Sequence, residues 1–131
     1  FGKEKRKDGD TMTQMTQDEL LKAAVKILDS KKAEDIRVIG IGDLTIIADY
    51  FIIADGTSTT HTKSLADELE FRLKEMGREP RQVQGNNGSN WIVLDYSDVV
   101  IHIFYKETRD FYNLERLWSD GHDVDIKQYL E

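Results

Sequence analysis

The stretch WIVLDYSDVVIHIF, residues 91–104, decides the fold class of this chain. Two runs rich in aliphatic and aromatic residues, 91–95 and 99–104, flank the short segment Tyr96-Ser97-Asp98, which predicts two strands joined in a β-hairpin. Successive side chains of a strand point to opposite faces of a sheet, and both alternating sets are largely apolar here. The hairpin therefore belongs to a sheet that is covered on both faces.

Two helices are predicted upstream of the hairpin. The pattern Thr16-Gln17-Asp18-Glu19 is a capping box, and the apolar stripe after it predicts a helix over about residues 17–32. A second helix is capped by Thr57 or Ser58 and runs to about residue 76. It ends there because Gly77 suits a left-handed terminal residue and Pro80 prevents continuation.

The remaining elements complete a sheet. β-Branched and apolar residues predict strands at 36–41 and 50–54, and a short strand at 81–84. The stretch 43–49 between the first two is predicted to be a loop or a short turn of helix. An amphipathic segment over about residues 108–118 predicts a last helix.

This order of elements predicts the fold class α/β (α+β), with a mixed sheet of about five strands flanked by helices. Three helices are few to cover both faces of five apolar strands. We therefore expect some apolar sheet or hairpin surface to remain available for a partner.

The chain of 131 residues has the length of one domain. We expect that single domain over residues 16–120. Residues 1–15 are expected to be a flexible leader, native or added for expression, because the first eleven residues hold seven charges and two glycines. Residues 121–131 are expected to form a polar C-terminal tail.

The charge balance argues for a protein partner. The chain has 18 Lys and Arg against 25 Asp and Glu, a formal net charge of −7. Direct nucleic-acid binding depends on Lys and Arg that displace counterions, so little of it is expected, whereas a basic protein surface would be attracted. With no Cys, disulfides, thiolate nucleophiles and cysteine-ligated metals are excluded. No window approaches the about 20 apolar residues of a membrane span, and no signal peptide is apparent, so a cytoplasmic location without membrane association is expected.

The titratable residues do not form a catalytic pattern. His61, His102 and His122 have no helical metal-ligand spacing. His102 alternates within an apolar strand and is interpreted first as a hydrogen-bonded structural histidine and second as an interface residue. His61 is interpreted as a neutral surface or loop-contact group. No metal, cofactor or catalytic residue is predicted, and no Gly-x-Ser-x-Gly elbow occurs.

One turn hints at phosphate chemistry. Gly56-Thr57-Ser58 follows a strand and opens a helix, as anion-binding turns do, and resembles the Gly-Ser turn of nucleotidyltransferases. Those enzymes need converging carboxylates, but Asp67 and Glu68 are adjacent on a helix and do not share a face. The only Asp-x-Asp pattern, Asp123-Val124-Asp125, lies in the expected tail. A capped turn without catalysis is the favoured interpretation.

The last third of the chain carries the most specific pattern. The final helix combines apolar residues with Arg109, Tyr112, Glu115 and Trp118, residue types that anchor protein interfaces. Three motifs occur in order: Ala48-Asp49-Tyr50-Phe51, Val99-Val100-x-His102-x-Phe104, and Arg109-x-Phe111-Tyr112-x-Leu114-Glu115-x-Leu117-Trp118. Together with His61 and Trp91-Ile92-Val93-Leu94-Asp95, they resemble the ribosomal silencing factor family, also called Iojap-like, over about residues 20–120.

This resemblance implies a nucleotidyltransferase-like topology that lacks the catalytic acids. It implies binding to the large ribosomal subunit through large-subunit ribosomal protein fourteen, on the intersubunit face, where the factor sterically blocks subunit joining and represses translation. A role in large-subunit assembly is the first alternative. A degenerate nucleotidyltransferase enzyme is the second.

The resemblance and the residue types together suggest a contact surface. A symmetric homodimer that buries the same apolar surface is a further expectation, and it would compete with the ribosome. Acids at the surface would pair with Lys or Arg of the partner. The predicted contact residues are Trp91, Asp95, Tyr96, Asp98, His102, Phe104, Arg109, Tyr112, Glu115 and Trp118.

Overall fold

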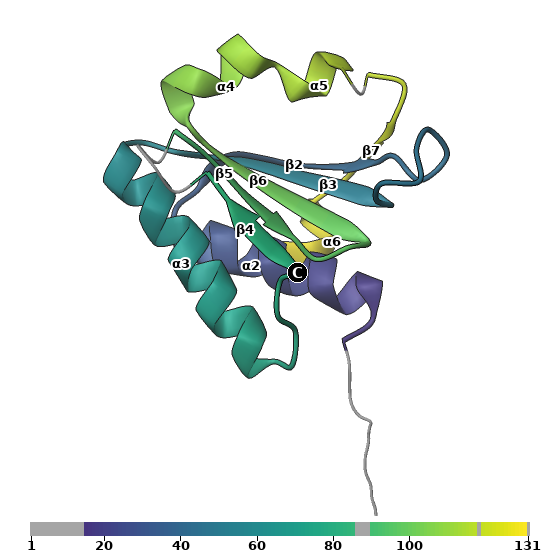
Figure 1. Ribbon diagram of the computed structural model, residues 1–131, viewed down its shortest axis with the longest axis horizontal. Coiled ribbons are helices and arrows are strands. Elements are labelled where there is room, and N and C mark those ends of the chain that lie inside the picture. Colours follow the sequence, from purple (N-terminus) through teal and green to yellow (C-terminus); the bar gives the residue numbers. More distant parts are fainter. Residues whose placement is uncertain (1–14, 86–89, 118, 131) are drawn as a thin grey trace, which may run out of the picture.

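The computed structural model describes residues 15–85, 90–117 and 119–130 (Figure 1). The side chains at positions 110–112, 114 and 117 lie outside this description, as do the expected leader up to residue 14 and most of the polar loop after Gly85. Among the described residues, no helix combines the length and the apolar character that crossing a membrane requires.

The described strands form one mixed sheet of six strands in the order β4-β5-β6-β3-β2-β7. Only β3 and β6 run parallel among these neighbours, and the other pairs are antiparallel. This confirms the predicted fold class. The strands are β2 (Glu34–Gly40), β3 (Tyr50–Gly56), β4 (Gln82–Gln84), β5 (Trp91–Asp95), β6 (Val99–Tyr105) and β7 (His122–Val124).

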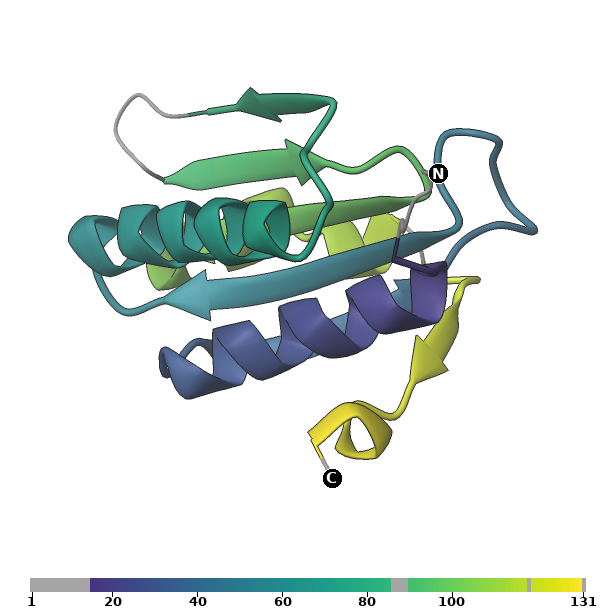
Figure 2. The same cartoon turned by 90° about the horizontal axis from the view of Figure 1, so that it is seen from below.

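Two long helices cover one face of the sheet (Figures 1 and 2). The first, α2 (Gln17–Ser30), has the predicted capping box, with the Thr16 hydroxyl accepting from the Glu19 N–H. The second, α3 (Thr59–Glu75), begins at the N-cap Ser58 and is followed by Gly77 at a φ of 96°. Their apolar stripes and the sheet residues beneath them form the larger core cluster, which includes Leu28, Leu69 and Ile101.

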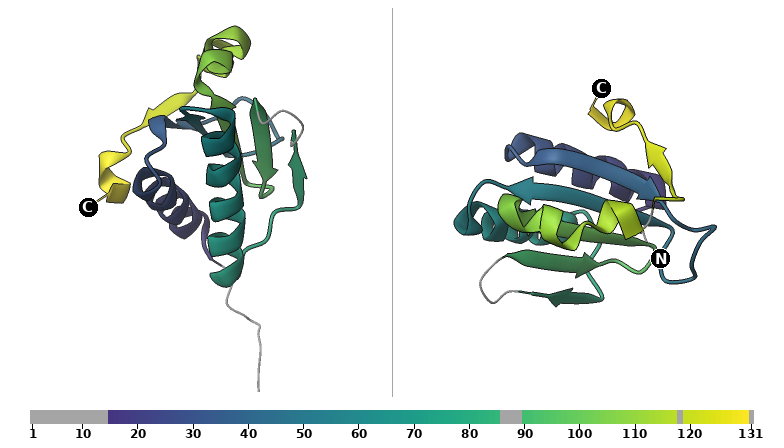
Figure 3. Two further views of the ribbon diagram at one scale, coloured as in Figure 1. Left: turned by 90° about the vertical axis from the view of Figure 1, so that its left-hand side faces the viewer. Right: turned by 90° about the horizontal axis from the view of Figure 1, so that it is seen from above.

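Two short helices lie across the opposite face (Figure 3). They are α4 (Lys106–Tyr112) and α5 (Leu114–Leu117), and Asn113 between them has a left-handed φ of 45°. The single helix predicted over 108–118 is therefore divided, because a residue in this conformation ends an α-helical turn.

The polar tail expected after residue 120 contributes to the fold. β7 pairs antiparallel with β2, and α6 (Lys127–Leu130) packs against α2 through the buried Tyr129. Val124 and Ile126 are half-buried against the same core. The apolar residues of this segment, although separated by charged ones, are sufficient to add a sixth strand to the sheet. The predicted sheet of about five strands omitted it.

The strand β3 extends through Gly56, beyond the predicted end at residue 54. Its central position explains the extension, because Asp55 pairs with Glu34 on one side and with Phe104 on the other. Gly56 is required here: a Cβ at this position would lie 2.4 Å from the Thr62 hydroxyl oxygen and 2.6 Å from its backbone nitrogen.

Candidate functional site

The structure buries four of the ten predicted contact residues and leaves four partly exposed. Tyr96, His102, Phe104 and Arg109 are buried, with Phe104 fully enclosed. In this conformation their side chains make structural contacts within the chain, and their assignment as contact residues stays a prediction. Trp91, Asp95, Asp98 and Glu115 are partly exposed and stay predictions. The Tyr112 side chain and Trp118 lie outside the described residues.

An aromatic cluster occupies the sheet face beneath α4 and α5. Trp91 and Phe104 are paired across β5 and β6, and their rings stack with centroids 5.1 Å apart. The Trp91 indole N–H donates to His102 Nδ1 at 3.1 Å, and the Phe51 ring meets the imidazole edge-on at 4.6 Å. His102 is therefore the hydrogen-bonded structural histidine that was the first interpretation.

The protonation state of His102 follows from these contacts. Nδ1 accepts a hydrogen bond, so the ring proton resides on Nε2, which has no hydrogen-bond partner among the described residues. Burial lowers the pKa of His102 to about 4, because the cation would be separated from water. The imidazole is neutral near pH 7 and supplies no charge to a partner.

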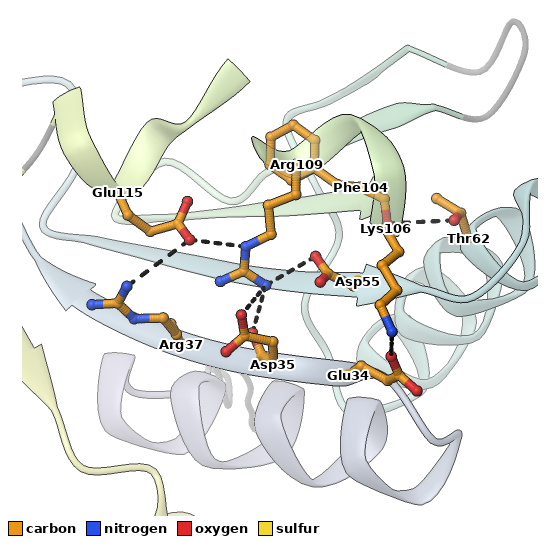
Figure 4. Close-up of polar contacts among 9 residues, drawn as sticks. All are labelled: Glu34, Asp35, Arg37, Asp55, Thr62, Phe104, Lys106, Arg109 and Glu115. Carbon is orange, nitrogen blue, oxygen red and sulfur yellow. Dashed lines mark hydrogen bonds and ion pairs between the residues drawn. The ribbon is translucent and has the colours of Figure 1, made fainter. Parts of the chain in front are cut away.

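Arg109 is the centre of a buried charge cluster that fastens α4 to the sheet (Figure 4). Its Nη1 donates to Asp55 Oδ1 at 2.9 Å and to the Asp35 carbonyl oxygen at 2.6 Å, and its Nε donates to Glu115 Oε2 at 2.9 Å. One guanidinium thereby joins α4, α5, β2 and β3. At the rim of the cluster, Lys106 Nζ lies 3.0 Å from Glu34.

The electrostatics of this cluster are dominated by burial. Desolvation raises the pKa of Asp55, and the hydrogen bond and positive charge of Arg109 oppose this shift. Arg109 Nη2 and Glu115 Oε1 are buried without a hydrogen-bond partner in the described part of the chain. The arrangement stabilises the position of α4 and α5 on the sheet.

The acids expected to bind partner cations at the hairpin are already paired within the chain. Asp95 accepts from Arg81 at 2.7 Å, and Asp98 accepts from Arg78 at 2.5 Å. Tyr96 between them is buried, and burial raises the pKa of its hydroxyl. A partner would have to share these carboxylates with Arg78 and Arg81.

In the turn that hinted at phosphate chemistry, Thr57 and Ser58 form hydrogen bonds to His61 of the same chain. The Ser58 hydroxyl accepts the His61 N–H at 3.0 Å, and the Thr57 N–H donates to His61 Nδ1 at 2.9 Å. His61 Nε2 lies 2.8 Å from the Lys31 carbonyl oxygen, so the predicted loop-contact role of His61 is confirmed. Asp67 pairs with Lys63, and within the described residues no His, Cys, Asp or Glu cluster could hold a metal ion.

The exposed apolar surface is not where it was expected. The aromatic sheet face is buried, and only its edge at Trp91 and Val93 is half-buried. Instead, Leu44, Ile46 and Ile47 are exposed at the tip of the loop between β2 and β3. The sequence predicts a loop or a short turn of helix here, and the only signal of an exposed patch is an aliphatic pair without helical or strand periodicity.

Comparisons with known proteins identify the family. Residues 14–131 match the family described as "Ribosomal silencing factor during starvation". The chain belongs to the ribosomal silencing factor family. The match includes the segment expected to be a tail, in agreement with the contribution of β7 and α6 to the fold.

Individual relatives agree with this membership. The chain is similar to "Ribosomal silencing factor RsfS" of Halalkalibacterium halodurans, at 37% identity over 113 residues, covering 86% of this chain and 97% of that protein. It is also 34% identical over 98 residues to a mouse protein named "Mitochondrial assembly of ribosomal large subunit protein 1", covering 72% of this chain and 43% of that one. A crystal structure of a Chromobacterium violaceum protein has a TM-score of 0.78 and 32% identity, covering 85% of this chain and 92% of that one.

Proposed function

We propose that this protein binds the large ribosomal subunit through large-subunit ribosomal protein fourteen and sterically blocks joining of the small subunit. The observation that carries the proposal is membership of the ribosomal silencing factor family over residues 14–131. In this mechanism the protein represses translation by occupying a docking surface, so the function requires no bond-making chemistry and no cofactor.

The electrostatics and the architecture support a steric mechanism. A net charge of −7 favours a basic ribosomal protein over exposed RNA. Helices lie on both faces of the sheet, and Arg109 joins α4 to it, so the domain is a packed body that can exclude a competing subunit.

A role in assembly of the large subunit is the second candidate. It is favoured by the relative named for assembly of the mitochondrial large ribosomal subunit. The two functions differ in the particle that is bound, since a silencing factor acts on mature large subunits and an assembly factor prefers immature ones.

Sedimentation of purified ribosomal subunits tests the proposal. Mature large subunits are incubated with the protein, small subunits are added, and the yield of joined ribosomes is measured. At a concentration about a hundredfold above the dissociation constant, roughly 1% of large subunits stay free, so joining should almost cease. Undiminished joining would refute the proposal, and preferential binding to immature particles in a parallel sedimentation run would favour the assembly role instead.

The enzymatic alternative has a separate readout. Magnesium–ATP would raise the melting temperature of the protein if a nucleotide bound beside Gly56-Thr57-Ser58. We expect no such rise, because the Thr57 N–H and the Ser58 hydroxyl already bond to His61. A homodimer remains a prediction that analytical ultracentrifugation would test.

A further inference from the structure

The loop between β2 and β3, residues 41–49, is anchored at its base. The N–H groups of Ile41 and Gly42 donate to the Asp49 carbonyl oxygen at 2.8 and 3.1 Å. The N–H of Asp49 donates to the Asp98 carbonyl oxygen at 2.8 Å, and the Asp49 carboxylate accepts from Gln17 at 2.8 Å. Ile41 is buried in the smaller apolar cluster, so the base of the loop has a defined position.

The tip of this anchored loop is apolar and solvent-exposed. Ile46 is fully exposed, Ile47 is 67% exposed and Leu44 is 44% exposed. The loop projects beyond the end of the sheet (Figure 2). Single exposed apolar residues are ordinary, but three within four positions on an anchored projection form a contiguous patch that favours contact with another molecule.

An acid-lined hollow of about 240 Å³ lies at the base of the same loop. Asp43 and Asp49 contribute its carboxylates, and Gln17, Tyr50 and His122 complete its polar wall. The Asp43 side chain is 89% exposed and has His122 Nε2 at 3.8 Å. None of the described residues that line the hollow is Lys or Arg, so its charge is suited to a cation.

The apolar loop tip and the acid-lined hollow together favour one class of partner. The phosphates of RNA and the headgroups of an anionic membrane would be repelled by Asp43 and Asp49, although a membrane could accept the apolar tip. A protein segment in which Lys or Arg neighbours aliphatic side chains complements both the apolar tip and the acidic hollow. Its aliphatic groups would cover Ile46 and Ile47, and its cation would enter the hollow.

We infer that the apolar loop tip (Leu44, Ile46 and Ile47) and the adjoining hollow of Asp43 and Asp49 form a docking surface for a basic protein segment of the large ribosomal subunit. This inference rests on the proposed function and adds to it the place of contact and the chemistry of the partner. Because the base of the loop is fixed by hydrogen bonds, little ordering is required on binding.

The test compares variants of the full chain in binding to purified large ribosomal subunits. Ile46→Ser with Ile47→Ser removes the apolar tip, and Phe71→Ser is the matched control because Phe71 is 60% exposed on α3, away from the loop. Asp43→Lys reverses a charge at the hollow, and Glu75→Lys makes the same charge change on exposed α3. Melting temperatures establish that all four variants are folded.

We expect the double serine variant to bind about tenfold or more weakly, since apolar anchors dominate such interfaces. Asp43→Lys should weaken binding about three- to tenfold, with a smaller effect at high salt. Phe71→Ser and Glu75→Lys should bind as the unmodified chain does. Addition of vesicles with anionic lipids should leave the unmodified chain in solution.

Other results would overturn the inference in distinguishable ways. If the unmodified chain binds and the loop variants bind equally well, the docking surface is elsewhere while the proposed function stands. If the loop variants lose only self-association in ultracentrifugation, the occupant of the tip is a second copy of this chain. If the unmodified chain does not bind large subunits, the proposed function fails and this inference fails with it.

Discussion

Replacing Arg109 with methionine tests whether the buried charge cluster holds α4 and α5 on the sheet. Methionine fills much of the same volume and removes the charge, so Asp55 loses its ion-pair partner at 2.9 Å and Glu115 loses its partner at 2.9 Å. Removing one member of a buried ion pair costs about 3–5 kcal/mol, because the remaining charge is buried without compensation.

The lower end of that range applies here. The Asp55 side chain is buried, but Glu115 retains some access to water and a second cation, Arg37, at 3.9 Å. We expect a loss of about 3 kcal/mol in the free energy of unfolding. For a chain of this size, that corresponds to a decrease of about 10 °C in the melting temperature.

Arg37→Met is the matched control. Arg37 pairs with Asp123 at 2.6 Å and with Glu115 at 3.9 Å, but both it and Asp123 are substantially exposed. Its loss should cost at most about 1 kcal/mol. Combining Arg109→Met with Asp55→Asn removes the uncompensated charge and should recover part of the stability.

The pH dependence of Arg109→Met provides an independent readout. The pKa of Asp55 already lies above its ordinary value of 3.8. The two effects that lower this pKa are the hydrogen bond from Arg109 and the positive charge of Arg109. In the variant, this pKa rises further, so the folded state binds the proton more tightly than the unfolded state. Ionisation of Asp55 then destabilises the fold increasingly as the pH rises through the new pKa.

The stability deficit of Arg109→Met should therefore shrink when the pH falls from 7 toward 4. Thermal unfolding followed by circular dichroism measures the deficit at each pH. A melting temperature equal to that of Arg37→Met, or a deficit that grows on acidification, would refute the assignment of Arg109 as the charge that compensates Asp55.

Three further predictions follow from single contacts. Gly56→Ala should destabilise the fold by about 3 kcal/mol or more in chemical denaturation, because its Cβ would lie 2.4 Å from the Thr62 hydroxyl, and relief by Thr62→Ala would be only partial since the Thr62 backbone nitrogen is 2.6 Å away. His102 should titrate near pH 4 in an NMR experiment; because its folded pKa is below the unfolded value of 6.5, it should lower stability as the pH falls from 6.5 toward 4, and His102→Gln should remove that part of the dependence. Tyr129→Ala should lower the melting temperature through loss of about 2–4 kcal/mol of packing against α2, and an unchanged value would show that α6 is dispensable for folding.

Local signals in the sequence predicted the elements well. The capping box of α2, the Ser58 cap and Gly77 at the ends of α3, and the turn between β5 and β6 depend on residues close together in the chain. Their chemistry is sufficient to specify a helix end or a hairpin without knowledge of the rest of the fold.

The burial of several predicted contact residues could not be predicted from the sequence, because it depends on contacts between distant residues. Arg109 has the residue type of an interface anchor, but Asp35 and Asp55, which lie 74 and 54 positions away, bury it. Similarly, Phe104 lies in the apolar strand β6, and its fully buried ring stacks on Trp91 of the neighbouring strand β5. The resemblance of motifs identified the family, but it could not separate residues that maintain the fold from residues that meet a partner.

The loop between β2 and β3 combines a fixed base with an exposed tip, and this combination suits a steric function. A factor that acts by occupying a surface gains from any contact that needs little reorganisation, because ordering a flexible segment on binding reduces affinity. Ile41 fixes the base of the loop in the apolar cluster, and Asp98 fixes it by backbone hydrogen bonds, while Ile46 and Ile47 stay exposed. Ile46 and Ile47 lie outside the buried core, so loss of binding without loss of stability is the signature expected of their double serine variant.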